Sequence, residues 1–454
     1  MTDSSPAEPS LKQKMLSGSI WVLFGKSTTV VCTLLSDMLL ARILDTDSFG
    51  LYTLAFSFVS VTSIVAQLGL HQAVVRFVAE SIGLGQGWRA RAAIGVVYRW
   101  APVGGLTLIV LLQLGAFNWL LRLWDAPQLG LSIGTLSLWA VLISFQVITS
   151  ETFRGFKDLR FAALFGGALT GILNVSMLAL IFFGWGTTTL ATIFHVVVIA
   201  ASCSLLIGLL VLYRTKVLPL ATGSGALQRQ VVLAVAMPLW GVAMINNMLA
   251  HADRWILAMV ATKTEVAIYG AAARMVMLVS QPLILINLLV PPFIAELYAK
   301  GEKRRLERIL RQTAALAGLP ALLVLLTFIF FGEPILGLIY GGDYRSGALI
   351  LAVLSIAKLA NVLTGSAGIT MTMTGHQNVM FRIAATVSGI SLVLCYFAAQ
   401  RYGPEGLAVV VASGSTLVFV LQWWATRRHT GMWTHPTIPT IADIKRLIAR
   451  EPKP

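Results

Sequence analysis

The sequence predicts an all-α integral membrane protein, with twelve transmembrane helices in two six-helix bundles related by a pseudo-two-fold axis along the membrane normal. Three observations lead to this fold class. Hydrophobic residues make up 57% of the 454 residues and charged residues only 12%, with a mean hydropathy of +0.81, whereas soluble domains carry about 25% charged residues. Apolar runs of about 20 residues, each long enough to cross a ~30 Å hydrocarbon core, recur along the chain. The two halves of the chain also repeat.

Twelve apolar segments are long enough to be spans, and the loops between them are too short to fold as separate domains. The spans are predicted near residues 18–40, 50–71, 93–115, 130–150, 160–183, 187–213, 230–251, 264–290, 312–332, 347–370, 381–399 and 404–425. The first run follows a polar tail and lacks a small-residue cleavage site, so it is expected to be an uncleaved helix rather than a signal peptide.

The spans divide the chain into tails, bundles and a linker. The divisions are a cytoplasmic N-terminal tail (1–17), an N-terminal bundle (18–213), a cytoplasmic linker rich in Gly, Ser and Thr (214–229), a C-terminal bundle (230–426) and a cytoplasmic C-terminal tail (427–454). In the last tail Ile441, Ile444, Leu447 and Ile448 fall on one helical face. This pattern fits either a short helix on the inner membrane surface or a solvated tail.

The basic residues determine the orientation. With the N-terminus inside, 25 of the 34 Lys and Arg residues lie on the cytoplasmic side, six lie on the opposite side and three lie within spans. Basic residues collect in cytoplasmic loops of membrane proteins, so both termini are expected inside. The same distribution explains the net charge of +15 without nucleic acid, which is excluded as a partner.

Matching residues in the two halves indicate an internal duplication. The pairs are Ala41 with Ala258 and Tyr52 with Tyr269 at an offset of 217, Pro102 with Pro320 at 218, and Gly155 with Gly375 and Phe161 with Phe381 at 220. Each repeat holds an even number of spans, so the halves share one orientation. This geometry predicts a central cavity between two bundles and alternating access.

Signals of catalysis are absent from the sequence. Cys32, Cys203 and Cys395 lie inside apolar runs and imply no disulfide framework. The segment FGKST (24–28) resembles the end of a phosphate-binding loop, but position 20 is Ile where that motif needs Gly. We therefore expect no enzyme activity, no cofactor and no metal site. Energy for transport would come from a gradient, or the substrate would pass passively.

Charged and polar residues inside the spans are the candidate functional residues, because a charge in hydrocarbon costs roughly 2.5–3.5 kcal/mol on insertion scales. In the first span Lys26, Thr29, Thr33 and Asp37 follow helical spacing and form one polar stripe. Lys26 is open to two interpretations, because its side chain could line a cavity or extend to the cytoplasmic interface.

The second half supplies further embedded residues. In the seventh span Trp240, Asn247, His251 and Arg254 make a similar stripe. Arg274 lies inside the eighth span, and Lys358 and Asn361 lie inside the tenth. Arg254 corresponds to Asp37 at an offset of 217. These two residues are candidates either for a gating ion pair across the pseudo-axis, with Asp253 beside it, or for an ordinary surface ion pair.

Embedded cations outnumber deep carboxylates, so the predicted cavity favours an anion. Lys26, Arg274 and Lys358 are well within their spans, whereas Asp37 and Asp253 lie toward the outer rim. Arginine offers phosphate a bidentate contact and lysine a point charge. A transporter of cationic drugs would need the opposite balance.

Three segments resemble a known family. LLARILDTDSFGLYTLAFSFVSVTSIVAQLGLHQAVVRFVAES (39–81) is similar to the N-terminal signature of the Wzx-like polysaccharide flippases of the multidrug/oligosaccharidyl-lipid/polysaccharide (MOP) exporter superfamily. RGFKDLRF and TGHQNVMFR resemble that family's loops after the fourth and tenth spans. Peptidoglycan-precursor flippases of the same superfamily carry an Arg before the matching Asp and two extra helices; here that residue is Ser36.

The resemblance implies a cationic central cavity and translocation of a polyprenyl-pyrophosphate-linked oligosaccharide to the outer leaflet of a bacterial inner membrane. Under this hypothesis Lys26, Arg274 and Lys358 attract the pyrophosphate, and Thr29, Thr33, Asn247 and Asn361 contact sugar or line the path. Further candidate partners are membrane lipids, polysaccharide polymerases and glycosyltransferases. The alternative is a proton- or sodium-coupled multidrug antiporter of the same superfamily, which would use Asp37, Asp253 or Glu151; a membrane scaffold without transport ranks last.

Overall fold

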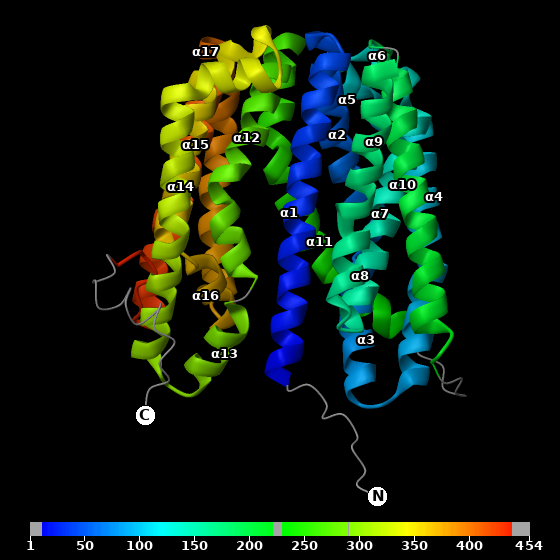
Figure 1. The fold of residues 1–454 in the computed structure, drawn as a ribbon, viewed down its shortest axis with the longest axis vertical. Coiled ribbons are helices and arrows are strands. Elements are labelled where there is room, and N and C mark those ends of the chain that lie inside the picture. Colours follow the sequence, from blue (N-terminus) through cyan, green and yellow to red (C-terminus); the bar gives the residue numbers. More distant parts are fainter. Residues whose placement is uncertain (1–10, 185, 221–228, 289, 438–454) are drawn as a thin grey trace, which may run out of the picture. The chain divides into compact units, whose positions relative to one another are not determined.

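The computed structural model describes residues 11–184, 186–220, 229–288 and 290–437, and the regular structure in these ranges is helical throughout (Figure 1). Contacts divide the chain into two compact units, Met1–Met259 (unit 1) and Val260–Pro454 (unit 2). The division into bundles at the linker 214–229 stays a prediction. The helix expected around residues 441–450 lies outside the described residues.

Unit 1 begins with long helices joined by short connections. Its elements are α1 (Leu11–Ile43), α2 (Thr46–Gln67), α3 (Leu70–Gly83), α4 (Gly87–Gln113), α5 (Asn118–Leu123), α6 (Pro127–Leu131), α7 (Ile133–Gly155), α8 (Leu159–Ala163), the π-helical segment η1 (Leu164–Ala168), α9 (Leu169–Gly184), α10 (Leu190–Leu212), the π-helical segment η2 (Tyr213–Val217) and α11 (Arg229–Val260).

Unit 2 has fewer elements, and two of them are very long. Its elements are α12 (Lys263–Asn287), α13 (Pro291–Ala299), α14 (Lys303–Ile339), the 3-10 segment η3 (Gly342–Gly347), α15 (Ala348–Thr364), α16 (Ala367–Met373) and α17 (Gln377–Thr430).

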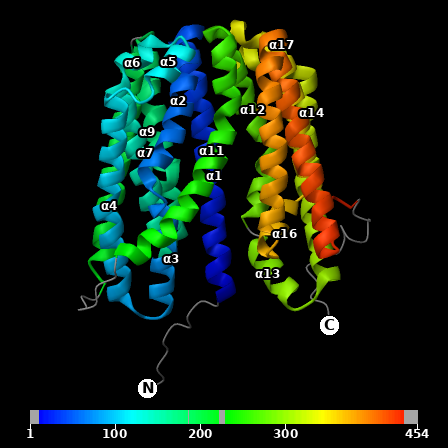
Figure 2. The same ribbon diagram turned by 180° about the vertical axis from the view of Figure 1, so that it is seen from behind.

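Eleven helices in the described residues are long and apolar enough to cross a membrane, and the last one accounts for two spans. At 1.5 Å per residue the 54 residues of α17 would extend about 80 Å, far beyond a ~30 Å hydrocarbon core. The helix breaks at Gly403, which has a φ of +61° and is followed by Pro404. Figure 2 shows the two segments joined at the top of the view and running side by side. The predicted fold class, an all-α integral membrane protein, is confirmed.

The helix of the predicted second span ends at Gln67, and a sharp bend leads directly into a further helix, α3. Leu68 and Gly69 both have positive φ, of 47° and 70°, and they separate α2 from α3. A Cβ on Gly69 would collide with the backbone of Ala236 and approach Trp240, both on α11. Glycine is therefore required here twice, by the backbone conformation and by the close approach of a neighbouring helix.

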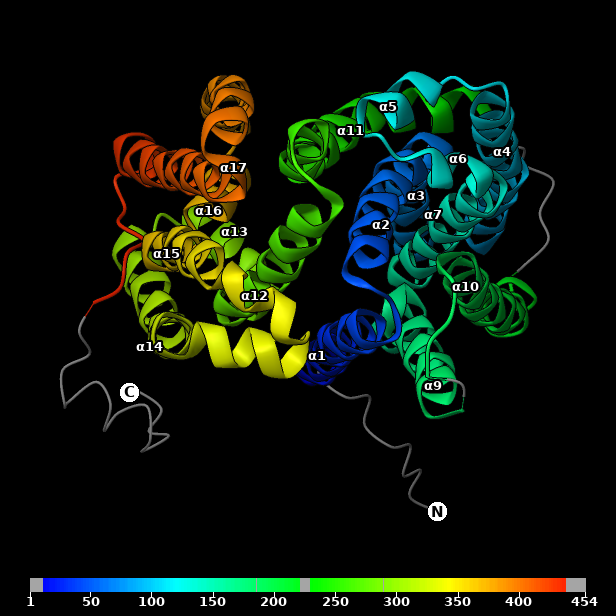
Figure 3. The same cartoon turned by 90° about the horizontal axis from the view of Figure 1, so that it is seen from above.

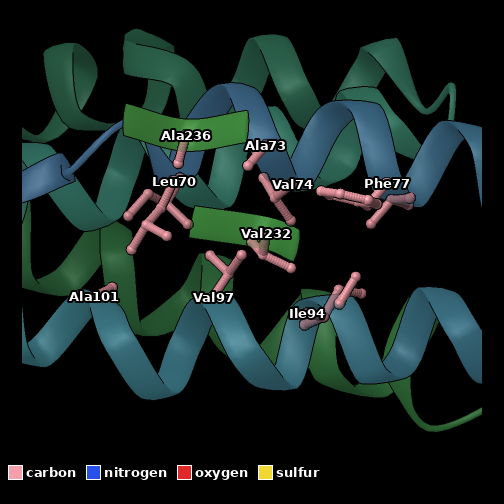
Figure 4. Packing of buried hydrophobic residues seen from close by; sticks show 12 residues of the cluster. Leu70, Ala73, Val74, Phe77, Ile94, Val97, Ala101, Val232 and Ala236 are labelled. Atoms are coloured by element: carbon pink, nitrogen blue, oxygen red, sulfur yellow. The ribbon is translucent and has the colours of Figure 1, made fainter. Parts of the chain in front are cut away.

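The helix α3, which the sequence did not predict, builds one core of unit 1 with α4 and α11. Figure 4 shows Leu70, Val74 and Phe77 of α3 facing α4, with Val232 of α11 packed between them. The α3 residues recur at intervals of three and four and so share one helix face. This packing places the first half of α11 in unit 1, where it crosses α2 and α3 (Figure 2).

Backbone hydrogen bonds repeat between the two units, which supports the internal duplication. Asp45 caps α2 and Thr262 caps α12, and these two residues are 217 positions apart. After α3 the backbone N–H groups of residues 85 and 86 donate to the carbonyls of residues 82 and 81, and after α13 residues 301 and 302 donate to residues 298 and 297 in the same pattern.

The third offset predicted from the sequence was wrong by two residues. After α7 the backbone N–H of Lys157 donates to Arg154, and after α16 the backbone N–H of Gly375 donates to Thr372, which is an offset of 218 rather than 220. The structural equivalent of Gly375 is therefore Lys157, not Gly155. Both have positive φ, of 60° and 83°. Sequence matching missed this because a lysine occupies the left-handed position in the first copy.

Helix α1 packs against α8, η1 and α9 through small residues. An ideal Cβ on Gly25 would lie 2.5 Å from the Cβ of Ala163, and one on Gly171 would lie 2.8 Å from the Cβ of Cys32. Small residues let helix backbones approach closely, which is how helices associate in lipid. The position of α1 therefore depends on these contacts.

We expect Gly25→Ala to lower the free energy of unfolding by about 1–3 kcal/mol, the usual cost of overpacking, because its Cβ would collide with Ala163. Gly95→Ala in α4 is the matched control, since a Cβ there meets nothing within 4 Å and alanine is the better helix former. Thermal unfolding in detergent compares the two variants. Equal midpoints would contradict the proposed contact.

We expect Asp45→Ala to cost about 0.5–2 kcal/mol of stability, because the side chain of Asp45 accepts a hydrogen bond from the backbone N–H of Ser48 at 3.1 Å. Hydrogen bonds from Ser48, first from its side chain and then from its backbone N–H, lower the pKa of Asp45. The stabilisation is therefore complete above the ordinary carboxyl pKa and is lost as pH falls through the lower, folded value. Asp45→Asn should keep the cap and remove this pH dependence in thermal unfolding at neutral and acidic pH; an unchanged midpoint for Asp45→Ala would refute the role.

Candidate functional site

The polar stripe of α1 changes from exposed to buried along the helix. Lys26 is exposed, Thr29 and Thr33 are half-buried, and Asp37 is buried. The hydroxyl of Thr29 donates to the carbonyl of Gly25 and that of Thr33 to the carbonyl of Thr29, both at 2.8 Å. Each hydroxyl proton is thereby engaged, so these side chains present oxygen lone pairs as acceptors.

Lys26 and Thr29 line a small cavity between α1, α7, α8 and η1, which we call the Lys26 pocket. It has a volume of about 40 Å³, and Ser150 and Arg154 also line it. Arg154 forms an ion pair with Glu151 at 2.7 Å, and Lys26 attracts the same carboxylate. Two cations and one carboxylate leave this pocket with a net positive charge, which suits an anion.

Arg154 is a candidate site residue that the sequence does not single out. The span predicted at 130–150 places it in the following cytoplasmic loop. In the structure α7 continues to Gly155, so that Arg154 stays on the helix and lines the Lys26 pocket. The sequence feature that could have identified Arg154 is its position at the start of the RGFKDLRF segment, which resembles a loop of the flippase family.

Helices α1 and α9 are joined by a buried polar contact. The side-chain amide of Asn174 donates to the hydroxyl of Ser36 at 3.1 Å, and both residues are buried. This contact lies one residue from Asp37, so it fixes the rotation of α1 at that level. Asn174 is therefore an interhelical hydrogen-bonding group.

Helix α11 carries the next set of predicted site residues and is held by tryptophans. The indole N–H of Trp240 donates to the carbonyl of Ile64 at 2.8 Å, and that of Trp255 donates to the hydroxyl of Ser57 at 2.9 Å. Between them Asn247 is half-buried, and its side-chain oxygen is buried without a hydrogen-bond partner among the described residues.

The C-terminal end of α11 contains a local polar network. Arg254 is 8% exposed, and its guanidinium lies 3.0 Å from Nδ1 of His251. The carboxylate of Asp253 accepts a hydrogen bond from the backbone N–H of Arg254 at 2.9 Å. Asp37 and Arg254 are both buried, and their gating role stays a prediction.

The remaining predicted site residues belong to unit 2. Arg274 on α12 and Lys358 and Asn361 on α15 are all half-buried, and α12 packs against α15. The burial of two cations within membrane-crossing helices agrees with a polar path rather than a lipid-facing position. The central cavity that would combine them with Lys26 stays a prediction.

A separate polar cluster lies near the C-terminal end of α17 in unit 2. Arg311 on α14 donates to the ring of His435 at 3.1 Å, and the indole of Trp423 lies 3.3 Å from the other ring nitrogen. Burial, and then the charge of Arg311, lower the pKa of His435. The neutral imidazole therefore anchors the segment after α17 to this unit.

The helices, the embedded cations and the positive pocket define a polytopic membrane transporter by class. Residues 39–349 match the family described as "Polysaccharide biosynthesis protein". The chain belongs to this family. The resemblance to polysaccharide flippases seen in the sequence is thereby confirmed.

A curated relative points the same way. The chain is 23% identical over 138 residues to the capsular polysaccharide biosynthesis protein CapF of Staphylococcus aureus. The match covers 30% of this chain and spans about a third (35%) of that relative's length.

Solved structures of the MOP superfamily share the fold. An inward-facing multidrug resistance MATE family transporter has a TM-score of 0.74 at 16% identity, covering 89% of this chain and 94% of that one. The lipid II flippase MurJ has a TM-score of 0.65 at 14% identity, covering 90% and 87%. A MOP superfamily transporter from Pyrococcus furiosus, titled for the reverse polarity of its binding pocket, has a TM-score of 0.63 at 15% identity, covering 92% and 96%.

We expect Ser36→Ala and Asn174→Ala to show a coupling free energy of about 0.6 kcal/mol, the average for polar contacts between membrane helices. The measurement is a double-mutant cycle on unfolding in detergent. Ser176→Ala paired with Ser36→Ala is the control, because the Ser176 hydroxyl bonds within its own helix. Coupling that is as small as in the control pair would show that the contact does not join the helices.

Proposed function

We propose that this protein is a flippase that moves a polyprenyl-pyrophosphate-linked oligosaccharide from the cytoplasmic to the outer leaflet by alternating access. Membership of a polysaccharide biosynthesis family and the MOP transporter fold support this function. The observation that carries it is the positive charge on membrane-crossing helices: Lys26 shares a pocket with Arg154, and Arg274 and Lys358 are half-buried.

A diphosphate suits these cations chemically. Its oxygens accept charge-assisted hydrogen bonds from guanidinium and ammonium groups, and arginine can contact them bidentately. Lys26, Arg274 and Lys358 are the residues we assign to this role.

The neutral polar residues suit the glycan. Sugar hydroxyls donate hydrogen bonds, and Thr29 and Thr33 present acceptor oxygens because their own protons are engaged. The buried side-chain oxygen of Asn247 offers another acceptor. With Asn361, these residues would line the path, while Asp37, Asp253 and Arg254 would form the gating ion pair near the outer side.

The setting of this proposal is a bacterial inner membrane with both termini in the cytoplasm. The excess of basic residues on one side of the membrane supports that orientation. The protein would act as a transporter rather than an enzyme, in contact with membrane lipids and with polysaccharide polymerase and glycosyltransferase proteins that make and use the glycan.

A cation-coupled multidrug antiporter is the second candidate, because a MATE family transporter shares the fold. That function needs carboxylates free to exchange a drug for an ion. Glu151 forms an ion pair with Arg154, and Asp253 accepts from its own helix backbone. Two of the three carboxylates named for this mechanism, Glu151 and Asp253, are therefore already engaged.

We expect the triple variant Lys26→Ala, Arg274→Ala, Lys358→Ala to abolish export of the lipid-linked glycan without lowering membrane abundance, because it removes the charges assigned to the pyrophosphate. The measurement is flipping in proteoliposomes that contain the purified protein. The matched control removes three exposed cations of α14, Lys303, Arg304 and Arg308, and should retain activity.

Replacing a lysine of the site by arginine tests whether export depends on the positive charge or on the shape of the side chain. Lys26→Arg and Lys358→Arg keep the positive charge and should keep export at a measurable rate. Normal export by the triple alanine variant would contradict the assignment of these three cations to the pyrophosphate. Wild-type protein that moves a lipophilic cation but not the glycan would favour the antiporter.

A further inference from the structure

An apolar groove lies on unit 1 between α1 and the α8–η1–α9 segment, and we call it the α1–α9 groove. It has a volume of about 330 Å³, and its larger lining residues are Trp21, Phe24, Arg160, Phe161, Leu164 and Ile172. This volume falls at the lower end of the range for ligand pockets, about 300–1,000 Å³. Figures 1 and 3 both place α1 beside α9.

The groove is apolar along its length and charged at one end. Trp21, Phe24, Leu164 and Ile172 are 47%, 65%, 36% and 44% exposed, as expected of side chains that face lipid. Arg160 lies in the first turn of α8, and Ile172 lies in the first turn of α9, on the other side of η1. An extended hydrocarbon chain with an anionic end matches this pattern.

The guanidinium of Arg160 is available to an anion. In the described part of the chain no carboxylate forms an ion pair with Arg160, whereas nearby Arg154 pairs with Glu151 and Lys216 pairs with Asp158, each at 2.7 Å. Arginine binds phosphate oxygens bidentately. A phosphate at this end of the groove would give Arg160 its partner.

The groove adjoins the Lys26 pocket. Gly25 and Ala163 line both, and their close contact separates the two. A diphosphate carries more negative charge than the single phosphate of an ordinary phospholipid. Arg160 on one side of the Gly25–Ala163 contact and Lys26 with Arg154 on the other match that larger charge.

A second groove, on unit 2, serves as a comparison because its lining is uncharged. The groove on unit 2 between α15 and α17 has a volume of about 490 Å³ and is lined by apolar and hydroxyl residues, among them Val353, Ile356, Val409 and Leu417. Its lining contains no charged residue. The larger groove therefore lacks the feature that would select a phosphorylated chain.

The wall of the α1–α9 groove is also an irregular helix. The segment η1 is π-helical, and Gly167 within it has a φ of 135°, a conformation open to glycine alone at low cost. A Cβ there would come within 3.3 Å of Thr29. Such π-helical insertions occur frequently at functional sites.

We propose that the α1–α9 groove binds the phosphate-proximal part of the isoprenoid tail of the lipid-linked glycan, with Arg160 contacting the diphosphate. The groove is the docking site from which the headgroup reaches the Lys26 pocket. This inference rests on the proposed function, since it names the place where that substrate's tail is held.

The test is native mass spectrometry of the purified full-length protein with a long-chain polyprenyl diphosphate as probe and phosphatidylglycerol as competitor. Arg160→Gln removes the phosphate contact and Ile172→Trp fills the groove. Each should weaken retention of the probe about tenfold, Arg160→Gln because it removes a charge-assisted hydrogen bond and Ile172→Trp because the indole occupies the groove. The controls are Arg122→Gln, an exposed arginine of α5, and Ile356→Trp in the unit 2 groove; both should bind as wild type does.

Wild-type binding by Ile172→Trp, or an equal loss in Ile356→Trp, overturns the inference. Displacement of the probe by equimolar phosphatidylglycerol also overturns it, because the site would then hold any anionic lipid. Thermal midpoints close to wild type show that the variants fold, and a photoreactive tail should label Phe24 or Leu164 in wild type.

Flipping in proteoliposomes separates this inference from the proposed function. If wild type moves the glycan and the two groove variants move it at the same rate, the groove assignment is wrong and the flippase stands. If wild type moves no glycan, the proposed function is wrong and the assignment of this occupant is withdrawn with it.

Discussion

A peptide group inside hydrocarbon must keep its hydrogen bond within its own helix, because no water is there to replace it. This constraint explains why the described residues of so apolar a chain fold only into helices. Helices whose backbone groups are hydrogen-bonded internally gain little from hydrophobic burial against each other in lipid. Their association therefore depends on close backbone approach and on polar contacts. Gly25 against Ala163 and Asn174 against Ser36 supply both kinds of contact for α1.

The sequence was a good guide to the spans and a poor guide to what lies between them. A span is predicted by its length and apolarity alone, which is why the crossing helices were found. The bend at Leu68–Gly69 and the amphipathic start of α14 at Lys303, well before the predicted residue 312, were missed. Both depend on packing: α3 exists because α4 and α11 cover its apolar face, and the first turns of α14 bury Leu306 and Leu310.

For the candidate site, composition identified the residues that are unusual in a membrane and could not identify those made important by position. Lys26, Arg274 and Lys358 stand out because a charge inside an apolar run is rare. Arg154 and Arg160 look like ordinary loop cations in the sequence. Only the folded chain shows that α7 extends far enough to bring Arg154 beside Lys26, and that Arg160 closes one end of an apolar groove.

The repeated turns after α7 and α16 show what the duplication has preserved. The same backbone hydrogen bonds form around Lys157 in one copy and Gly375 in the other, although a positive φ is sterically less favourable for lysine than for glycine. The duplication is therefore visible in the backbone hydrogen bonds of the two copies rather than in the identity of their side chains. The side chains differ between the copies: unit 1 holds the Lys26 pocket and the α1–α9 groove with Arg160 in its lining, whereas the groove between α15 and α17 in unit 2 has no charged residue in its lining.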